Sequence, residues 1–154
     1  MQKYDDEVRG VHATGEITPD EIIVEVPLAC LITVEMGKAT DVGRAVLSAD
    51  LELDAPKHVF LMLFMLIDRA NESSHFKPYY DILPPTLSNM PIFWNNEELA
   101  LLEGSYLLTQ IDERNAAIET DYQAICELYP GFSDTATLDD FKWARMCVCS
   151  RNFG

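Results

Sequence analysis

The sequence predicts an α+β fold, in which a β-rich start is followed by a mostly helical remainder. Residues 1–35 hold short apolar runs separated by turn residues. Residues 57–71 contain an unbroken apolar run made of helix-forming residues, and residues 105–129 repeat apolar side chains at helical spacing. A length of 154 residues suits one domain that buries a hydrophobic core.

The β-rich start is predicted from two apolar-rich runs, Val8 to Ile17 and Glu21 to Val26, joined by Thr18-Pro19-Asp20. Proline at the second position of a turn, followed by aspartate, favours a type I turn, so the pair should form a β-hairpin. Pro27 ends the second strand because proline cannot donate to a ladder. Leu31 to Val34 supplies a third short strand.

The central element is a run of nine apolar residues, Val59 to Ile67, which leaves no polar side on a helix. Such a helix is covered on nearly all faces, so it should be the central helix of the core. Leucine, methionine and phenylalanine dominate the run, and Pro56 precedes it, where a first helical turn needs no backbone donor. Nine helical residues rise roughly 14 Å against a hydrocarbon core of about 30 Å, which excludes a membrane span.

The segments on either side of this helix carry weaker signals. Asp41 to Leu47 could form one or two helical turns within an acidic loop. After the central helix, Ser73 to Pro85 combines prolines with aromatic residues, which predicts a connector that covers one end of the core.

The second half is predicted to be helical and well capped. Asn95 and Glu98 have the spacing of a capping box, and Ser105 can begin a helix that runs to Tyr129. Thr137 is an N-cap for a last helix, Leu138 to Arg151. On the long helix, apolar positions follow helical spacing, and the opposite face should be solvated. That face comprises Asp112, Glu113, Arg114, Glu119 and Asp121.

The charge balance restricts the class of partner. Twenty-six acidic residues against eleven basic residues give a net charge of -15. This charge repels phosphate backbones and anionic lipids, so neither a nucleic acid nor a membrane is expected as partner. The N-terminus has no apolar core of a signal peptide, which favours an intracellular location, cytoplasmic or nuclear.

The cysteines and histidines form no recognisable reactive motif. Cys147 and Cys149 are close in sequence, but no second pair completes a four-ligand zinc spacing, so no metal is expected. The three histidines lie next to no serine or cysteine nucleophile motif, so a hydrolase triad is not supported.

Several stretches together resemble the SET-domain protein methyltransferases, of the subclass that includes the Rubisco large-subunit lysine methyltransferases and the actin-histidine methyltransferase. Four segments carry this resemblance in the family's order and at about its spacing. They are Gly10-Val11-His12-Ala13-Thr14-Gly15-Glu16-Ile17 with Val26-Pro27; Ser74-His75-Phe76-Lys77-Pro78-Tyr79 with Leu83-Pro84; Pro91 to Trp94 with Glu97, Leu101 and Gly104-Ser105; and Phe141-Lys142-Trp143-Ala144 with Ser150-Arg151-Asn152-Phe153-Gly154.

The resemblance implies a partial SET domain over residues 1–154. Residues 1–35 would be the N-terminal SET strands, 36–150 a helical insertion, and 151–154 the start of the C-terminal half. The family transfers a methyl group from S-adenosyl-L-methionine to a protein side chain without a metal. The reaction depends mainly on positioning and desolvating the nucleophile.

The cofactor-binding residues that the resemblance implies are Glu7, Val8, Arg9, Gly10 and Arg151. A guanidinium can hold the cofactor's carboxylate bidentately, which suits Arg151. Without the resemblance, Arg151 would be an ordinary arginine that complements a helix dipole. The family has Glu-Gly-x-Gly where this chain has Glu7-Val8-Arg9-Gly10, so the freedom of the first glycine is lost.

Two hypotheses follow. In the first, the chain is the N-terminal fragment of a monomeric methyltransferase that acts on a protein, most favourably on lysine, with histidine possible. The family's Asn-His motif and catalytic tyrosine would then lie after Gly154, and this chain alone would be inactive, with no catalytic residue of its own. In the second, the chain is a non-catalytic helical protein-interaction module derived from the SET scaffold. The sequence does not identify the methylated protein, the residue or the degree of methylation.

Overall fold

The computed structural model describes residues 2–3 and 9–152. The chain divides into two compact units, Met1–Leu31 and Ile32–Gly154. The second unit is helical and contains the hydrophobic core.

The first unit has little regular structure. Strands β1 (Gln2–Lys3) and β2 (Arg9–Gly10) pair antiparallel, with Gln2 opposite Gly10, and η1 (Leu28–Cys30) is a single 3-10 turn. Glu21 N–H donates to the Thr18 carbonyl at 3.2 Å, so the predicted turn forms. Asp20 has φ 66°, which is typical of a type II turn and not of the predicted type I.

The predicted α+β fold is therefore wrong for this structure. Of the predicted strands, only Arg9–Gly10 is extended and paired among the described residues, and Val34 instead begins a helix. The apolar side chains between these points are uncovered, with Val11 86% and Ile22 79% exposed. A hairpin without a third strand or a covering helix is marginal in water, and the described part of the chain supplies neither to residues 11–26.

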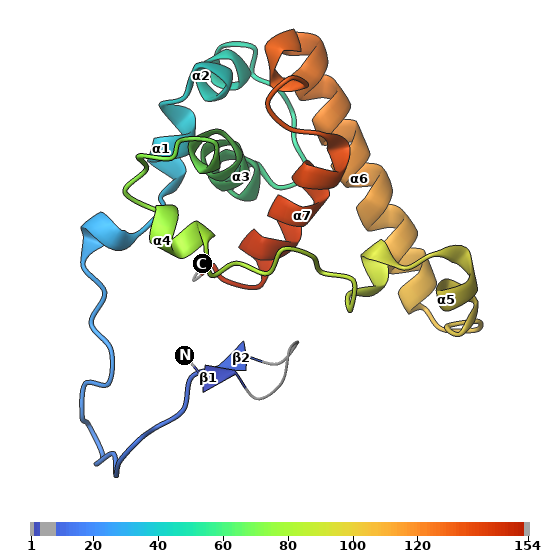
Figure 1. Cartoon of the computed structure of the whole chain (residues 1–154). Coiled ribbons are helices and arrows are strands. Elements are labelled where there is room, and N and C mark those ends of the chain that lie inside the picture. The colour runs from blue at the N-terminus through green and yellow to red at the C-terminus, as the bar shows by residue number, and fades with distance from the viewer. Residues whose placement is uncertain (1, 4–8, 153–154) are drawn as a thin grey trace. The chain divides into compact units, whose positions relative to one another are not determined.

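The second unit is built from helices and short 3-10 turns (Figure 1). In chain order they are α1 (Val34–Lys38), α2 (Asp41–Ser48), α3 (Pro56–Arg69), α4 (Lys77–Tyr80), η2 (Pro91–Phe93), α5 (Asn96–Ala100), α6 (Leu107–Leu128), η3 (Pro130–Phe132) and α7 (Leu138–Cys149). None of the helices in residues 32–152 is both long and apolar enough to cross a membrane.

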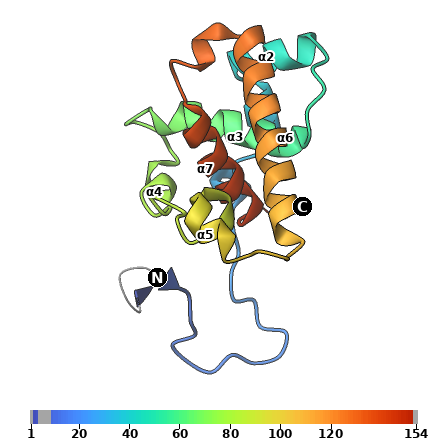
Figure 2. The ribbon, with the colours of Figure 1, turned by 90° about the vertical axis from the view of Figure 1, so that its right-hand side faces the viewer.

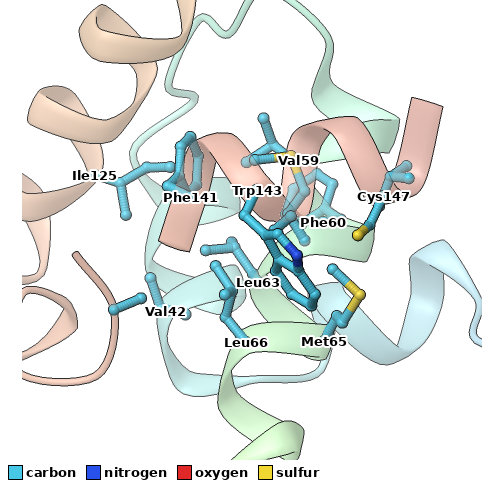
Figure 3. Close-up of a cluster of buried hydrophobic side chains, with 14 of the residues drawn as sticks. Val42, Val59, Phe60, Leu63, Met65, Leu66, Ile125, Phe141, Trp143 and Cys147 are labelled. Carbon is cyan, nitrogen blue, oxygen red and sulfur yellow. The ribbon is translucent and has the colours of Figure 1, made fainter. Parts of the chain in front are cut away.

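Helix α3 is the centre of the core, as predicted. Its residues Val59, Met62 and Leu63 are fully buried, and α1 and α7 pack closely on it. Figure 3 shows side chains from α3, α6 and α7 that meet in one apolar cluster. Helix α6 packs against α7 and against α2, and Figure 2 shows α6 and α7 side by side.

The contact between α1 and α3 depends on a glycine. A Cβ atom on Gly37 would lie 1.9 Å from the carbonyl oxygen of Phe60, so no side chain fits there without a shift of the backbone. The two helix backbones therefore approach as closely as they do because residue 37 has no side chain.

The aromatic connector after α3 covers one end of the core, as predicted. Phe76 and Tyr80 are buried, whereas Tyr79 is half-buried. The hydroxyl of Tyr80 donates to the Asp68 carboxylate at 2.8 Å, and Trp143 Nε1 donates to the Pro84 carbonyl at 2.9 Å. These bonds fix the connector to α3 and α7.

Two of the predicted caps of the second half are confirmed, but Ser105 is not the N-cap of α6, which begins at Leu107 after Tyr106. Asn95 with Glu98, and Thr137 with Asp140, form complete capping boxes at the starts of α5 and α7. Helix α6 buries Ile111, Ile118 and Ile125, which agrees with the predicted apolar face. The prediction for Asp121 is wrong, because its side chain is buried and accepts a hydrogen bond from the backbone N–H of Asp54 at 3.1 Å.

The capping box of α7 should make stability depend on pH. Hydrogen bonds from the Thr137 side chain and backbone lower the pKa of Asp140 below its ordinary value. A group whose pKa is lower in the folded state contributes stability above its unfolded pKa and loses it as the pH falls through the folded pKa. We expect Asp140→Ala to lower the free energy of unfolding at pH 7 by about 1 kcal/mol. The difference from wild type should shrink as the pH falls below about 4.

Urea denaturation of both chains at pH 7 and pH 3 measures this difference. Asp139→Ala is the control, because Asp139 is exposed in the same first turn but is not part of the capping box. A difference between wild type and Asp140→Ala that is equal at the two pH values would contradict the assigned role of the carboxylate.

Candidate functional site

The turn that follows α7 carries Arg151, the predicted cofactor-binding arginine. The backbone N–H groups of Arg151 and Asn152 both donate to the Val148 carbonyl at 3.0 Å, which closes the turn. Ser150 Oγ donates to the Met146 carbonyl at 2.8 Å and accepts from Arg151 Nη1 at 2.6 Å. The guanidinium is thus held at the C-terminal end of a helix, where positive charge is favourable.

A histidine from α3 contacts the residues on both sides of Arg151. His58 Nε2 lies 2.9 Å from Asn152 Nδ2, and His58 Nδ1 lies 3.8 Å from Cys149 Sγ. Burial lowers the pKa of His58, and the positive charges of Arg145 and Arg114 lower it further, while Asp54 opposes them. A neutral imidazole can accept from the Asn152 amide and direct Nδ1–H toward the sulfur.

The charge of Arg151 also acts on the side chains of Tyr79 and Cys147. Burial raises the pKa of Tyr79, and the positive charge of Arg151 partly opposes that rise. Burial likewise raises the pKa of Cys147 to about 11, again opposed by Arg151 and also by Arg69. Cys147 is therefore a protonated core thiol at neutral pH and not a nucleophile.

A polar network ties the start of α3 to α6 and α7. Arg145, which is 1% exposed, donates through Nη2 to Asp54 Oδ2 at 2.7 Å. Arg114 Nη1 lies 3.7 Å from the same oxygen. Burial raises the pKa of Asp121, and the hydrogen bond from the Asp54 N–H opposes that rise. This network fixes the segment just before α3, and so the start of the helix that carries His58, to α6 and α7.

The other predicted site residues lie in the first unit. Glu7 and Val8 are outside the described residues. Arg9 and Gly10 form β2, and Gly10 is half-buried. Gly10 thus belongs to the first unit and Arg151 to the second.

The hollow described in this structure lies away from the described site residues. Among residues 2–3 and 9–152, no group of three histidine, cysteine, aspartate or glutamate side chains could hold a metal ion. A hollow of about 360 Å³ is lined by the start of α2, by Ile67 and by residues 129–135, and not by Gly10, His58 or Arg151.

Sequence reasoning missed the neighbours of Arg151. His58 lies more than ninety positions before Asn152, in no motif, and nothing in the sequence indicates that the two meet. The same is true of Asp54 and Arg145, which form their ion pair only because α3 and α7 pack together.

Comparison with known proteins finds relatives that match nearly the whole chain. No protein-family model matches the chain. The ribulose-1,5 bisphosphate carboxylase/oxygenase large subunit N-methyltransferase of Pisum sativum is 31% identical over 149 residues, which are 94% of this chain and 29% of that protein. The actin-histidine N-methyltransferase of Gallus gallus is 29% identical over 159 residues, which cover 98% of this chain and 26% of that protein.

A solved structure shows that the likeness extends to the fold. The crystal structure of the SET domain of LSMT bound to MeLysine and AdoHcy matches with a TM-score of 0.75 and 30% identity, over 89% of this chain and 31% of that chain. The chain is homologous to part of a SET-domain protein methyltransferase. It spans between 26% and 31% of the lengths of these SET-family relatives.

Proposed function

We propose that the chain is the N-terminal part of an S-adenosyl-L-methionine-dependent protein N-methyltransferase that acts on lysine. The observation that carries this proposal is the match, over 89% of the chain, to a SET domain crystallised with MeLysine and AdoHcy. Relatives named for lysine and for histidine targets match at similar identity, so histidine is the alternative target. The full-length enzyme would act as a monomer, inside the cell, on a protein substrate.

The residues around Arg151 fit the cofactor's carboxylate. Arg151 is exposed, and no carboxylate of the described residues lies within ion-pair distance of it. Its guanidinium can therefore bind the carboxylate of a ligand without breaking an existing ion pair. In the first unit, the strand that contains Gly10 would let the cofactor approach the backbone closely.

The position of Arg151 at the end of α7 suggests what each part of the proposed enzyme would do. When bound, S-adenosyl-L-methionine supplies the methyl group. Arg151 would orient the cofactor through its carboxylate, and residues 36–150 would hold that arginine on a rigid helical body. The remaining parts of the active site would come from outside these 154 residues, so this chain alone should not transfer methyl groups.

Replacement of Arg151 tests the proposal in the full-length protein. Arg151→Ala should weaken binding of S-adenosyl-L-methionine by roughly 2 to 4 kcal/mol, because one partner of a hydrogen-bonded charge pair is removed. Arg151→Lys should rescue binding only in part, since an ammonium cannot bind a carboxylate bidentately. Isothermal titration calorimetry measures both affinities.

Arg44→Ala is the matched control, because Arg44 is an exposed arginine of α2 that pairs with Asp41. Its affinity for the cofactor should equal that of wild type. Full-length protein that binds no cofactor would instead favour the non-catalytic interaction module. Equal affinity of wild type and Arg151→Ala would remove Arg151 from the site.

A further inference from the structure

The turn of residues 150–152, which carries Arg151, is contacted by a residue from outside α7. Within the turn, the N–H groups of Arg151 and Asn152 donate to the Val148 carbonyl and the N–H of Ser150 donates to the Met146 carbonyl, and the side chains at 151 and 152 are exposed. The last turn of a helix is among the first parts of a structure to open. A contact from another helix should therefore strongly affect how rigidly the turn, and with it the Arg151 guanidinium, is positioned.

His58 provides this contact from a rigid position. It is the third residue of α3, and the next residue, Val59, is fully buried in the core. Its two ring nitrogens contact Asn152 at 2.9 Å and Cys149 at 3.8 Å, one residue after and two residues before Arg151. A ring held at both nitrogens cannot rotate freely, so it fixes the turn relative to α3.

We propose that His58 is a positioning residue, which holds the turn of residues 150–152 so that the Arg151 guanidinium is preorganised for the cofactor's carboxylate. The inference rests on the proposed function of Arg151. His58 touches neither cofactor nor substrate in this proposal and acts only through the turn.

The electrostatic surroundings suit a neutral imidazole in this role. The positive charges of Arg145 and Arg114 disfavour an imidazolium at His58, and Asp54 opposes them only in part. A neutral ring adds no positive charge beside the Arg151 guanidinium. It also leaves one ring nitrogen free to accept from the Asn152 amide.

The test titrates full-length protein with S-adenosylhomocysteine by calorimetry. Loss of the hydrogen bond in His58→Ala should weaken binding about tenfold. Asn152→Ala, which removes the same contact from an exposed residue, should have a similar effect and leave the unfolding temperature unchanged. His58→Gln, whose side-chain oxygen can accept from Asn152, should restore most of the affinity. Lys57→Ala is the control, because Lys57 is exposed and adjacent on α3.

Coupling to Arg151 separates positioning from a general structural role. In an Arg151→Ala background, His58→Ala should weaken binding no further, because the arginine that it positions is gone. An equal additional loss in that background would overturn the proposal. The proposal would also be overturned if His58→Ala and Asn152→Ala bound S-adenosylhomocysteine as tightly as wild type while Arg151→Ala bound it weakly.

The same titrations separate a failure of the cofactor-binding role of Arg151 from a failure of the positioning role of His58. Wild-type affinity of Arg151→Ala would refute the assignment of Arg151 itself, and with it the role of His58. A weakened Arg151→Ala together with unaffected His58→Ala and Asn152→Ala would refute only the positioning role.

Discussion

Replacing Leu63 with alanine should lower the free energy of unfolding by about 4 kcal/mol. Leu63 is fully buried in the middle of α3, where it lies in the cluster shared with α6 and α7 (Figure 3). Truncation removes buried methyl groups and leaves a cavity that packed helices on several sides cannot fill. Guanidinium denaturation followed by circular dichroism measures the loss.

The control for Leu63 is a leucine outside the core. Leu101 is 83% exposed, so Leu101→Ala should change the free energy of unfolding by less than about 0.5 kcal/mol. A similar small effect of Leu63→Ala would show that α3 is not the centre of the core.

Replacing Asp54 with alanine should lower the free energy of unfolding by about 3 kcal/mol, because the Arg145 guanidinium would stay buried without its carboxylate. This is the lower end of the range for breaking a buried pair, since the Asp54 side chain is 43% exposed and water can reach one side of it. Arg145 Nε already has no hydrogen-bond partner in the described part of the chain, so the guanidinium has little compensation left.

Two variants define the origin of that loss. Asp54→Asn keeps an acceptor but removes the charge, so it should fall between wild type and Asp54→Ala. Asp41→Ala removes the carboxylate of the exposed pair with Arg44 and should have an effect below about 1 kcal/mol. Equal effects of Asp54→Ala and Asp41→Ala in the same denaturation series would mean that the buried network does not stabilise the fold.

The helical core could be predicted from the sequence because its signals are local. Nine successive apolar residues define α3, and the capping boxes at Asn95 and Thr137 need only residues three positions apart. Asp121 was misplaced on the solvated face because its partner, the Asp54 N–H, comes from a distant segment that no local pattern reveals.

The strands and the site depend on distant partners in the same way. Residues 11–26 have the composition of strands, but a strand persists only when another strand or a helix covers it. For Arg151, the sequence and its resemblance indicate the residue, whereas the contacts of His58 follow from the packing of α3 beside α7. These contacts determine the geometry of the candidate site.

Hydrogen exchange on the purified 154-residue chain, with and without S-adenosylhomocysteine, shows whether the helical unit folds and whether the chain binds the ligand by itself. We expect strong protection of α3 and α7 and fast exchange of Ile22 to Val26. We also expect no change when the ligand is added, because we propose that the rest of the cofactor site is supplied from outside these 154 residues. Strong protection of Ile22 to Val26, or ligand-dependent protection near Gly10 and Arg151, would show that this chain forms a complete site by itself and would contradict the account.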